Sequence, residues 1–321
     1  MIIHLVFLIA GFILLVKGAD WLVTGASAVG RKLHIPQMVI GLTLVALGTS
    51  LPEFFINIIG SIAGKNDIVL GNIIGSNIFN ILLILGVSAA IYPIKAEKNT
   101  VYREIPFVIL VSVILFILAN DSLLGCSQSV ISRGDGIILF FFMGYFMFYL
   151  YGISKNDGVA DHPVKDLSVI RISLNILAGM LGLIIGGNLV VNSAVSIAQS
   201  LNVSEKLIAV TIIAIGTGLP ELFTSLVASI KHNSGLALGN IVGSNIFNVL
   251  LVVSASSIVY PIEVATRDYL VDFILLMICS FILFVSMFLV KKSTITRKEG
   301  FFFVFLYILY IVYNVMTITY A

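Results

Sequence analysis

The sequence predicts an all-α integral membrane protein with ten transmembrane helices, arranged as two inverted five-helix repeats in which helices 2 and 7 are broken. Composition is the first reason: the 321 residues are 59% hydrophobic and 11% charged, with a mean hydropathy of +1.13. Soluble domains carry about 25% charged residues. The second reason is that apolar runs long enough to cross a bilayer recur throughout the chain. The third is an internal sequence repeat that carries a proline within one apolar run of each half.

Apolar runs bounded by polar residues predict the ten spans. Their expected ranges are 2–29, 36–63, 68–92, 101–119, 134–151, 170–201, 204–230, 236–260, 269–290 and 300–320. The first and sixth are about 45 Å long at 1.5 Å per residue, so they should tilt strongly or pass the membrane surface. The first run lacks a basic segment before it and a cleavage site after it, which predicts a retained span rather than a signal peptide.

The repeat aligns residues 18–94 with residues 186–262 at a constant offset of 168. Its two strongest segments are GTSLPE, matched by GTGLPE, and GNIIGSNIFN, matched by GNIVGSNIFN with nine of ten residues identical. The tripeptide YPI also recurs at the end of both copies. Self-similarity of this density indicates a duplicated structural unit.

Five spans per repeat force the second copy to cross the membrane in the opposite direction to the first, as in many secondary transporters. We therefore predict a first repeat at 1–153, a polar linker at 154–168 and a second repeat at 169–321.

Positive charge predicts the orientation, because cytoplasmic loops are enriched in Lys and Arg. One side of the expected bundle holds thirteen such residues, namely Arg31, Lys32, Lys95, Lys98, Arg103, Lys155, Lys165, Arg171, Lys231, Lys291, Lys292, Arg297 and Lys298. The other side holds Lys65, Arg133, Lys206 and Arg267. The linker should therefore be cytoplasmic and both termini outside, in a multi-pass protein of the cell (plasma) membrane.

Other classes of partner find little support in the sequence. A net charge of +2 is spread over the loops without the basic patch that nucleic acid requires. The two cysteines, Cys126 and Cys279, form neither a disulfide framework nor a metal motif. We expect no cofactor, no nucleic acid and no obligatory protein partner, and we expect inorganic cations and the lipid bilayer as partners.

Glu53 and Glu221 are the residues that most need a function. A carboxylate at the centre of an apolar span costs about 2.5–3.5 kcal/mol, and such residues usually mark ion or substrate pathways. Each follows a proline, Pro52 or Pro220, which has no N–H to donate to the carbonyl four residues earlier. Broken helices at membrane depth expose such carbonyls to cations. The same two glutamates buried for structural reasons alone would be the alternative.

Helical spacing adds further oxygen ligands. Residues four apart share one face of a helix, and polar residues recur at that spacing. The first half supplies Thr49, Glu53, Asn72, Ser76 and Asn80, and the second supplies Thr217, Glu221, Asn240, Ser244 and Asn248. Oxygen ligands without His or Cys favour hard cations such as Ca²⁺ or Na⁺. Two nearby carboxylates need neutralisation, so competing cations at one site would give antiport.

Two other classes are weaker alternatives. An intramembrane hydrolase could use the glutamates as acid and base, but the sequence has no HExxH and no histidine in a catalytic motif. A channel would fit the composition, although a paired inverted site favours saturable counter-transport.

These motifs resemble the cation/calcium exchanger superfamily, whose two alpha-repeats are similar to residues 41–82 and 209–250. The resemblance implies a secondary active antiporter that exchanges Ca²⁺ for Na⁺ by alternating access, with the first and sixth helices sliding. It also implies the set of ligands. These are Glu53 and Glu221 at the centre; Thr49, Ser50, Ser76 and the Ala46 carbonyl on one flank; Thr217, Ser244 and the Ala214 carbonyl on the other; and Asn80 and Asn248 completing the middle.

The sequence departs from the family pattern at two positions. Gly218 stands where a serine is expected, which predicts a weaker sodium site beside Thr217. Asn248 stands where sodium/calcium exchangers often carry Asp, so the charge of the site stays near −2. An H⁺-coupled or K⁺-assisted divalent cation exchanger remains the alternative within transporters.

Overall fold

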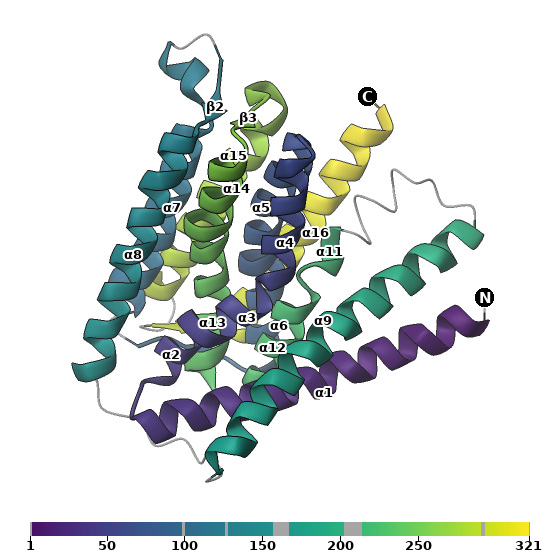
Figure 1. The fold of residues 1–321 in the computed structure, drawn as a ribbon, viewed down its shortest axis with the longest axis vertical. Coiled ribbons are helices and arrows are strands. Elements are labelled where there is room, and N and C mark those ends of the chain that lie inside the picture. Colours follow the sequence, from purple (N-terminus) through teal and green to yellow (C-terminus); the bar gives the residue numbers. More distant parts are fainter. Residues whose placement is uncertain are drawn as a thin grey trace.

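The structure is a computed structural model, and it describes residues 2–97, 100–125, 128–156, 167–201, 214–289 and 293–320 (Figure 1). The first half contains α1 (Ile2–Leu33), α2 (Gln37–Ile40), η1 (Gly41–Val45), α3 (Ala46–Thr49), α4 (Leu51–Ile62), α5 (Asn66–Ile78), η2 (Phe79–Ile84), α6 (Leu85–Ile91), η3 (Thr100–Glu104), α7 (Ile105–Leu118), η4 (Asp121–Leu124) and α8 (Arg133–Asn156). The second half contains α9 (Val169–Ser200), α11 (Ala214–Gly216), α12 (Leu219–Ile230), α13 (Ser234–Phe247), η6 (Asn248–Val253), α14 (Ser254–Val259), α15 (Thr266–Leu289) and α16 (Arg297–Tyr320).

Within these residues, eight helices are long and apolar enough to cross a membrane, and the bent pair of 37–49 with 51–62 would make a ninth span. The chain is therefore a multi-pass helical membrane protein. The expected range 36–63 is not one continuous helix, because the chain bends by 48° between α3 and α4. Residues 204–213 of the expected seventh span and 157–166 of the expected linker lie outside the described residues. The count of ten spans stays a prediction.

The two longest helices, α1 and α9, pack side by side in opposite directions and run obliquely to the other helices (Figure 1). Glycine allows their backbones to touch. A Cβ atom at Gly18 would lie 2.8 Å from Leu183 N, and one at Gly186 would lie 2.9 Å from Gly11 O. Small residues at a helix interface allow such close approach within a membrane. The two helices therefore form one tightly packed pair.

Four short strands lie beyond the helix ends and were not predicted from the sequence. Strand β1 (Ile94–Lys95) pairs antiparallel with β4 (Thr294–Ile295), and β2 (Val130–Ile131) pairs antiparallel with β3 (Ile262–Glu263). Strands β1 and β3 each begin at the isoleucine of one copy of the YPI motif. Each pairing joins a segment of the first half to a segment of the second half.

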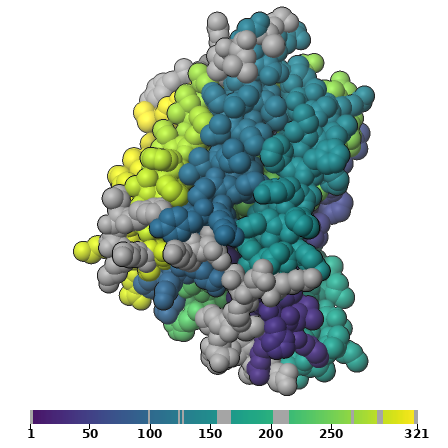
Figure 2. Space-filling view, turned by 90° about the vertical axis from the view of Figure 1, so that its left-hand side faces the viewer, coloured from purple at the N-terminus to yellow at the C-terminus, as the bar shows by residue number. Residues whose placement is uncertain are grey.

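The outer face of the bundle is apolar, as contact with lipid requires. Figure 2 views the side on which α7 and α8 form one continuous surface beside α15. On α8, the side chains of Phe141, Tyr145 and Phe148 are 75%, 64% and 74% exposed. By contrast, α13 is buried from Leu236 to Phe247 and lies at the centre of the molecule. The polar residues of both repeat motifs are carried on such central helices.

Candidate cation-binding site

Two helix breaks create the candidate site. Ser50 separates α3 from α4 with φ −82° and ψ 6°, and Gly218 separates α11 from α12 with φ −82° and ψ 2°. Pro52 and Pro220 are the second residues of the helices that follow, and neither has an N–H to continue the preceding helix. The chain therefore breaks in the same way at both copies of the motif.

Glu53 and Glu221 lie just beyond these breaks, in the first turns of α4 and α12. Their side chains are only 2% and 1% exposed, so both carboxyl groups are buried. The amino end of a helix carries partial positive charge, which stabilises a carboxylate there. Each group also meets a hydroxyl of the other half: Ser50 Oγ lies 3.1 Å from Glu221 Oε1, and Thr217 lies within reach of Glu53. The two glutamates thus form one buried site.

Both glutamates retain an oxygen without a donor. Glu53 Oε2 and Glu221 Oε2 are buried and have no hydrogen-bond partner among the described residues. The same holds for Asn80 Oδ1 and Asn248 Oδ1, on side chains that are each 2% exposed. A buried acceptor without a donor costs about 1–3 kcal/mol, and more when it is charged. A cation bound close to any of these oxygens would relieve its cost.

Two threonines each donate a hydrogen bond to an asparagine of the other half. Thr49 Oγ1 donates to Asn240 Oδ1 at 3.0 Å, and Thr217 Oγ1 donates to Asn72 Oδ1 at 3.4 Å. These contacts are equivalent under the offset of 168, because Thr49 matches Thr217 and Asn72 matches Asn240. The structure therefore brings together the threonines and asparagines that helical spacing predicted.

The flank beside Ser50 is rich in hydroxyl groups. Ser50 Oγ lies 3.1 Å from Ser244 Oγ as well as from Glu221 Oε1. Ser244 is fully buried and Ser76, its counterpart on α5, is 6% exposed. The Glu221 carboxylate therefore meets a hydroxyl of the first half, which in turn contacts a hydroxyl of the second half.

The flank beside Gly218 is different. A Cβ atom at Gly218 would lie 2.6 Å from Phe79 Cε1 and 2.7 Å from Phe79 Cδ1. Phe79 is 3% exposed and packs edge-on against Tyr307, with ring centroids 5.5 Å apart. An aromatic ring therefore fills the space in which the expected serine side chain would lie. Sequence reasoning missed Phe79, although it precedes Asn80 in the repeat motif.

The two predicted carbonyl ligands belong to Ala46, before the first helix break, and Ala214, before the second. The Ala46 carbonyl already accepts a hydrogen bond from Ser50 N at 3.0 Å and lies 3.3 Å from Thr49 Oγ1. Because the Thr49 hydroxyl donates to Asn240 Oδ1, the second lone pair of the Ala46 carbonyl could bind a cation. Ala214 is the first residue of α11, and the residues before it lie outside the described part of the chain.

The donor set suits a hard cation. Nowhere in the described ranges do three or more His, Cys, Asp or Glu side chains cluster to hold a metal ion. The site instead offers two carboxylates supported by neutral amide and hydroxyl oxygens, which are the ligands that Ca²⁺ and Na⁺ accept. A soft transition metal would need thiolate or imidazole ligands.

Other intramembrane acids are paired with tyrosines. Glu104 is 2% exposed and accepts a hydrogen bond from Tyr149 on α8. Asp272 on α15 accepts one from Tyr310 on α16 at 3.1 Å. These pairs tie adjacent helices together and are separate from the two glutamates of the site. Asp20 on α1 forms an ion pair of 2.6 Å with Lys231.

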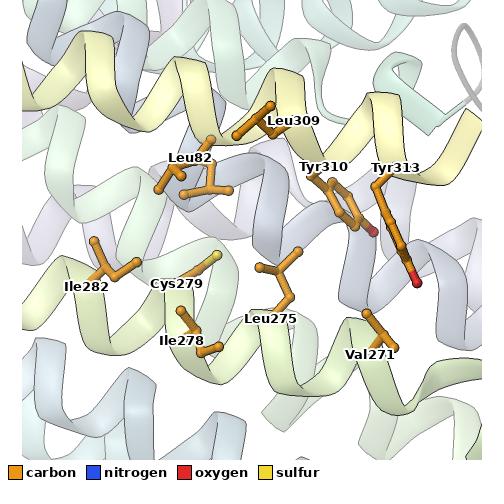
Figure 3. Close-up of a pocket in the computed structure, with 10 residues that line it drawn as sticks. Leu82, Val271, Leu275, Ile278, Cys279, Ile282, Leu309, Tyr310 and Tyr313 are labelled. Carbon is orange, nitrogen blue, oxygen red and sulfur yellow. The ribbon is translucent and has the colours of Figure 1, made fainter.

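A hollow of about 300 Å³ lies between α15 and α16 (Figure 3). Its lining is apolar and includes Leu82, Leu275 and Cys279, with Tyr310 and Tyr313 at one end. No carboxylate lines it, so it offers a cation nothing comparable to the pair of glutamates.

Comparison with known proteins identifies the family of the chain. A family model described as sodium/calcium exchanger protein matches residues 3–152 and 173–316. CaxA of Alkalimonas amylolytica, a candidate antiporter, is 35% identical over 308 residues, which cover 94% of this chain and 95% of the relative. The sodium/calcium exchanger MaX1 of Methanosarcina acetivorans is 29% identical over 350 residues, covering 97% and 98%. A structure of the sodium-calcium exchanger NCX_Mj superposes with a TM-score of 0.82 at 33% identity, over 97% of this chain and 98% of that one.

Proposed function

Because the chain belongs to the sodium/calcium exchanger protein family, we propose that it is a secondary active antiporter that exchanges Ca²⁺ for Na⁺ between Glu53 and Glu221. Membership of this family makes it a transporter rather than an intramembrane hydrolase. One observation carries the proposal: the two buried carboxylates and the amides of Asn80 and Asn248 each present an acceptor oxygen without a donor among the described residues.

Charge explains why such a site exchanges ions rather than releasing them freely. Two unit charges about 4 Å apart repel by about 4 kcal/mol at an effective dielectric constant of 20. Glu53 and Glu221 are both buried, so the proposed site needs positive charge. One Ca²⁺ or two Na⁺ supply it equally. Release of one cation is then favourable only when another cation, Na⁺, Ca²⁺ or H⁺, replaces it, and this is the condition for antiport.

The oxygens have separate tasks in this proposal. Glu53 and Glu221 supply the charge for Ca²⁺, and the Asn80 and Asn248 oxygens complete its coordination. Thr49, Ser50, Ser76 and the Ala46 carbonyl would hold Na⁺ on one flank, and Thr217, Ser244 and the Ala214 carbonyl would hold it on the other. Phe79 beside Gly218 narrows the second flank.

Alternating access would use the pair formed by α1 and α9. We propose ten spans in two inverted repeats, at 1–153 and 169–321, joined by a linker at 154–168. Cross-contacts at the offset of 168 support it, for example Ser112 Oγ at 3.3 Å from Ser280 Oγ. The close glycine contacts between α1 and α9 favour their movement as a unit. The linker would face the cytoplasm and both termini the exterior of the plasma membrane.

Vesicle transport tests the proposal directly. Purified protein is reconstituted into liposomes, and Ca²⁺ uptake is measured under an imposed Na⁺, K⁺ or pH gradient, each applied alone. We expect uptake driven by an outward Na⁺ gradient and none with Glu53→Gln protein. Uptake driven only by a pH gradient, or only in the presence of K⁺, would replace Na⁺ coupling by the corresponding alternative. Ca²⁺ flux that needs no counter-ion would refute antiport.

A further inference from the structure

Four buried asparagines connect the two halves next to the candidate site. Asn77 and Asn80 lie at the junction of α5 and η2, and Asn245 and Asn248 lie at the junction of α13 and η6. All four side chains are between 1% and 2% exposed. The offset of 168 relates Asn77 to Asn245 and Asn80 to Asn248.

Their hydrogen bonds cross between the halves. Asn80 Nδ2 donates to Asn245 Oδ1 at 3.0 Å, and Asn248 Nδ2 donates to Asn77 Oδ1 at 3.0 Å. Asn77 is itself oriented, because its Nδ2 donates to the Asn245 backbone carbonyl at 3.4 Å. Asn80 and Asn248 are therefore held by residues of the opposite half.

An asparagine amide has an oxygen at one end and an NH₂ group at the other. Only the oxygen can bind a cation. Turning the Asn248 amide by 180° would aim its NH₂ at the cation and bring its oxygen against Asn77 Oδ1, where two acceptors repel. In the observed orientation, the Asn80 and Asn248 oxygens are the ends without a partner among the described residues.

We propose that Asn77 and Asn245 are positioning residues of the cation site. Each accepts a hydrogen bond from the ligand amide of the opposite half and thereby keeps that ligand's oxygen toward the cation. The inference rests on the proposed function, because it assumes that Asn80 and Asn248 bind the transported cation. Neither Asn77 nor Asn245 would contact the cation itself.

The rival explanation is that these asparagines only pack the helices together. Both explanations predict that Asn77→Ala weakens the protein, so stability does not separate them. The orientation of the Asn248 side chain matters, however, only while one end of its amide is an oxygen and the other is an NH₂ group. A carboxylate has oxygen at both ends, so Asn248→Asp removes the need for orientation and keeps the shape of the side chain.

The experiment compares Asn77→Ala in two backgrounds. Ca²⁺ affinity is measured by calorimetric titration of the purified full chain. Removing a side chain that orients a metal ligand usually lowers affinity by about 10–100-fold, and we expect that range for Asn77→Ala in the wild-type background. In the Asn248→Asp background, a carboxylate oxygen replaces the NH₂ group that faces Asn77 Oδ1. We therefore expect the same substitution to cause no loss of affinity, or a gain as the repulsion between the two acceptors is removed. An equal loss in both backgrounds would overturn the proposal.

A double-mutant cycle adds a matched control. Asn77 is proposed to act only through Asn248. The Asn77→Ala/Asn248→Ala double variant should therefore bind Ca²⁺ no more weakly than Asn248→Ala alone. Asn77 lies in α5 and Asn80 in the adjoining η2, and no hydrogen bond between their side chains is seen among the described residues. The losses of Ca²⁺ affinity caused by Asn77→Ala and Asn80→Ala should therefore multiply in the double variant. The opposite pattern would contradict the crossed arrangement. If Asn77→Ala is too unstable to purify, Asn245→Ala with Asn80→Asp repeats the test on the other arm.

The outcomes also separate this inference from the proposed function. If neither wild type nor Asn248→Asp binds Ca²⁺, the proposed function fails. If wild type binds Ca²⁺, Asn248→Ala weakens that binding and Asn77→Ala does not, the site stands and the positioning role fails.

Discussion

Gly218→Ser tests whether space or chemistry determines the residue at the second helix break. From the sequence alone, restoring the missing hydroxyl should strengthen the sodium site beside Thr217. The structure predicts the reverse. Gly218 has φ −82° and ψ 2°, which match the −82° and 6° of Ser50, so its backbone does not require glycine. Its surroundings do, because a Cβ atom would lie 2.6 Å from the ring of Phe79.

The expected magnitude follows from that contact. Non-bonded carbon atoms prefer about 3.5–4.0 Å, so Phe79 would have to move by about 1 Å. The ring is 3% exposed and fixed against Tyr307, so it has little room to turn. Overpacking of this kind costs about 1–3 kcal/mol. Gly218→Ser should therefore lower stability by that amount without improving apparent Na⁺ affinity.

The assay combines unfolding in detergent with the Na⁺ dependence of Ca²⁺ flux in vesicles. Gly218→Ala is the matched control, because it adds the same Cβ atom without the hydroxyl and should lose similar stability. Phe79→Leu in the Gly218→Ser background should restore part of the loss. A Gly218→Ser protein as stable as wild type, with a lower half-saturation for Na⁺, would refute the steric argument.

Three further predictions concern the carboxylates, the topology and the charge carried. Glu53→Gln or Glu221→Gln should abolish Ca²⁺ transport in folded protein, whereas Glu104→Gln, which keeps an acceptor for Tyr149, should retain most of it; half the wild-type flux in either site variant would contradict the assignment. A cysteine at Ser154, in a variant without native cysteines, should be labelled from the cytoplasmic side only, and labelling from outside would reverse the topology. If two Na⁺ exchange for each Ca²⁺, no net charge crosses the membrane, so Ca²⁺ accumulation at a fixed Na⁺ gradient should change less than twofold between 0 and −100 mV. An exchange that moves one net charge would change accumulation about fiftyfold, because one charge across 100 mV is worth about 2.3 kcal/mol.

Periodic features were predictable from the sequence. Long apolar runs predicted the observed helices to within a few residues at most ends, because the thickness of the bilayer fixes the length of a span. Proline next to glutamate predicted the interruption between α3 and α4, because proline removes a backbone donor. Spacing by four residues predicted that Thr49 and Glu53 belong to one polar region.

Contacts between the two halves were not predictable in the same way. Helical periodicity places residues on one face of one helix, but it does not say which atoms of a distant helix they meet. The packing of α5 against η6 decides that Asn77 meets Asn248, and the packing of η2 against the start of α12 decides that Phe79 covers Gly218. Asn77 and Phe79 both lie in the repeated motif GNIIGSNIFN. The sequence therefore identified these positions, but it did not show which residues they contact.

The charge of the proposed site and the space beside Gly218 predict its stoichiometry. Glu53 and Glu221 carry a charge of −2 when both are ionised, and the amides of Asn80 and Asn248 add none. One Ca²⁺ or two Na⁺ balance this charge, whereas a third Na⁺ would leave a buried positive charge without a partner, which is costly. The ring of Phe79 also occupies the space beside Gly218 where a hydroxyl could otherwise hold an additional Na⁺. Charge and space therefore both favour two Na⁺ for each Ca²⁺, so that the concentration gradients alone would set the direction of exchange.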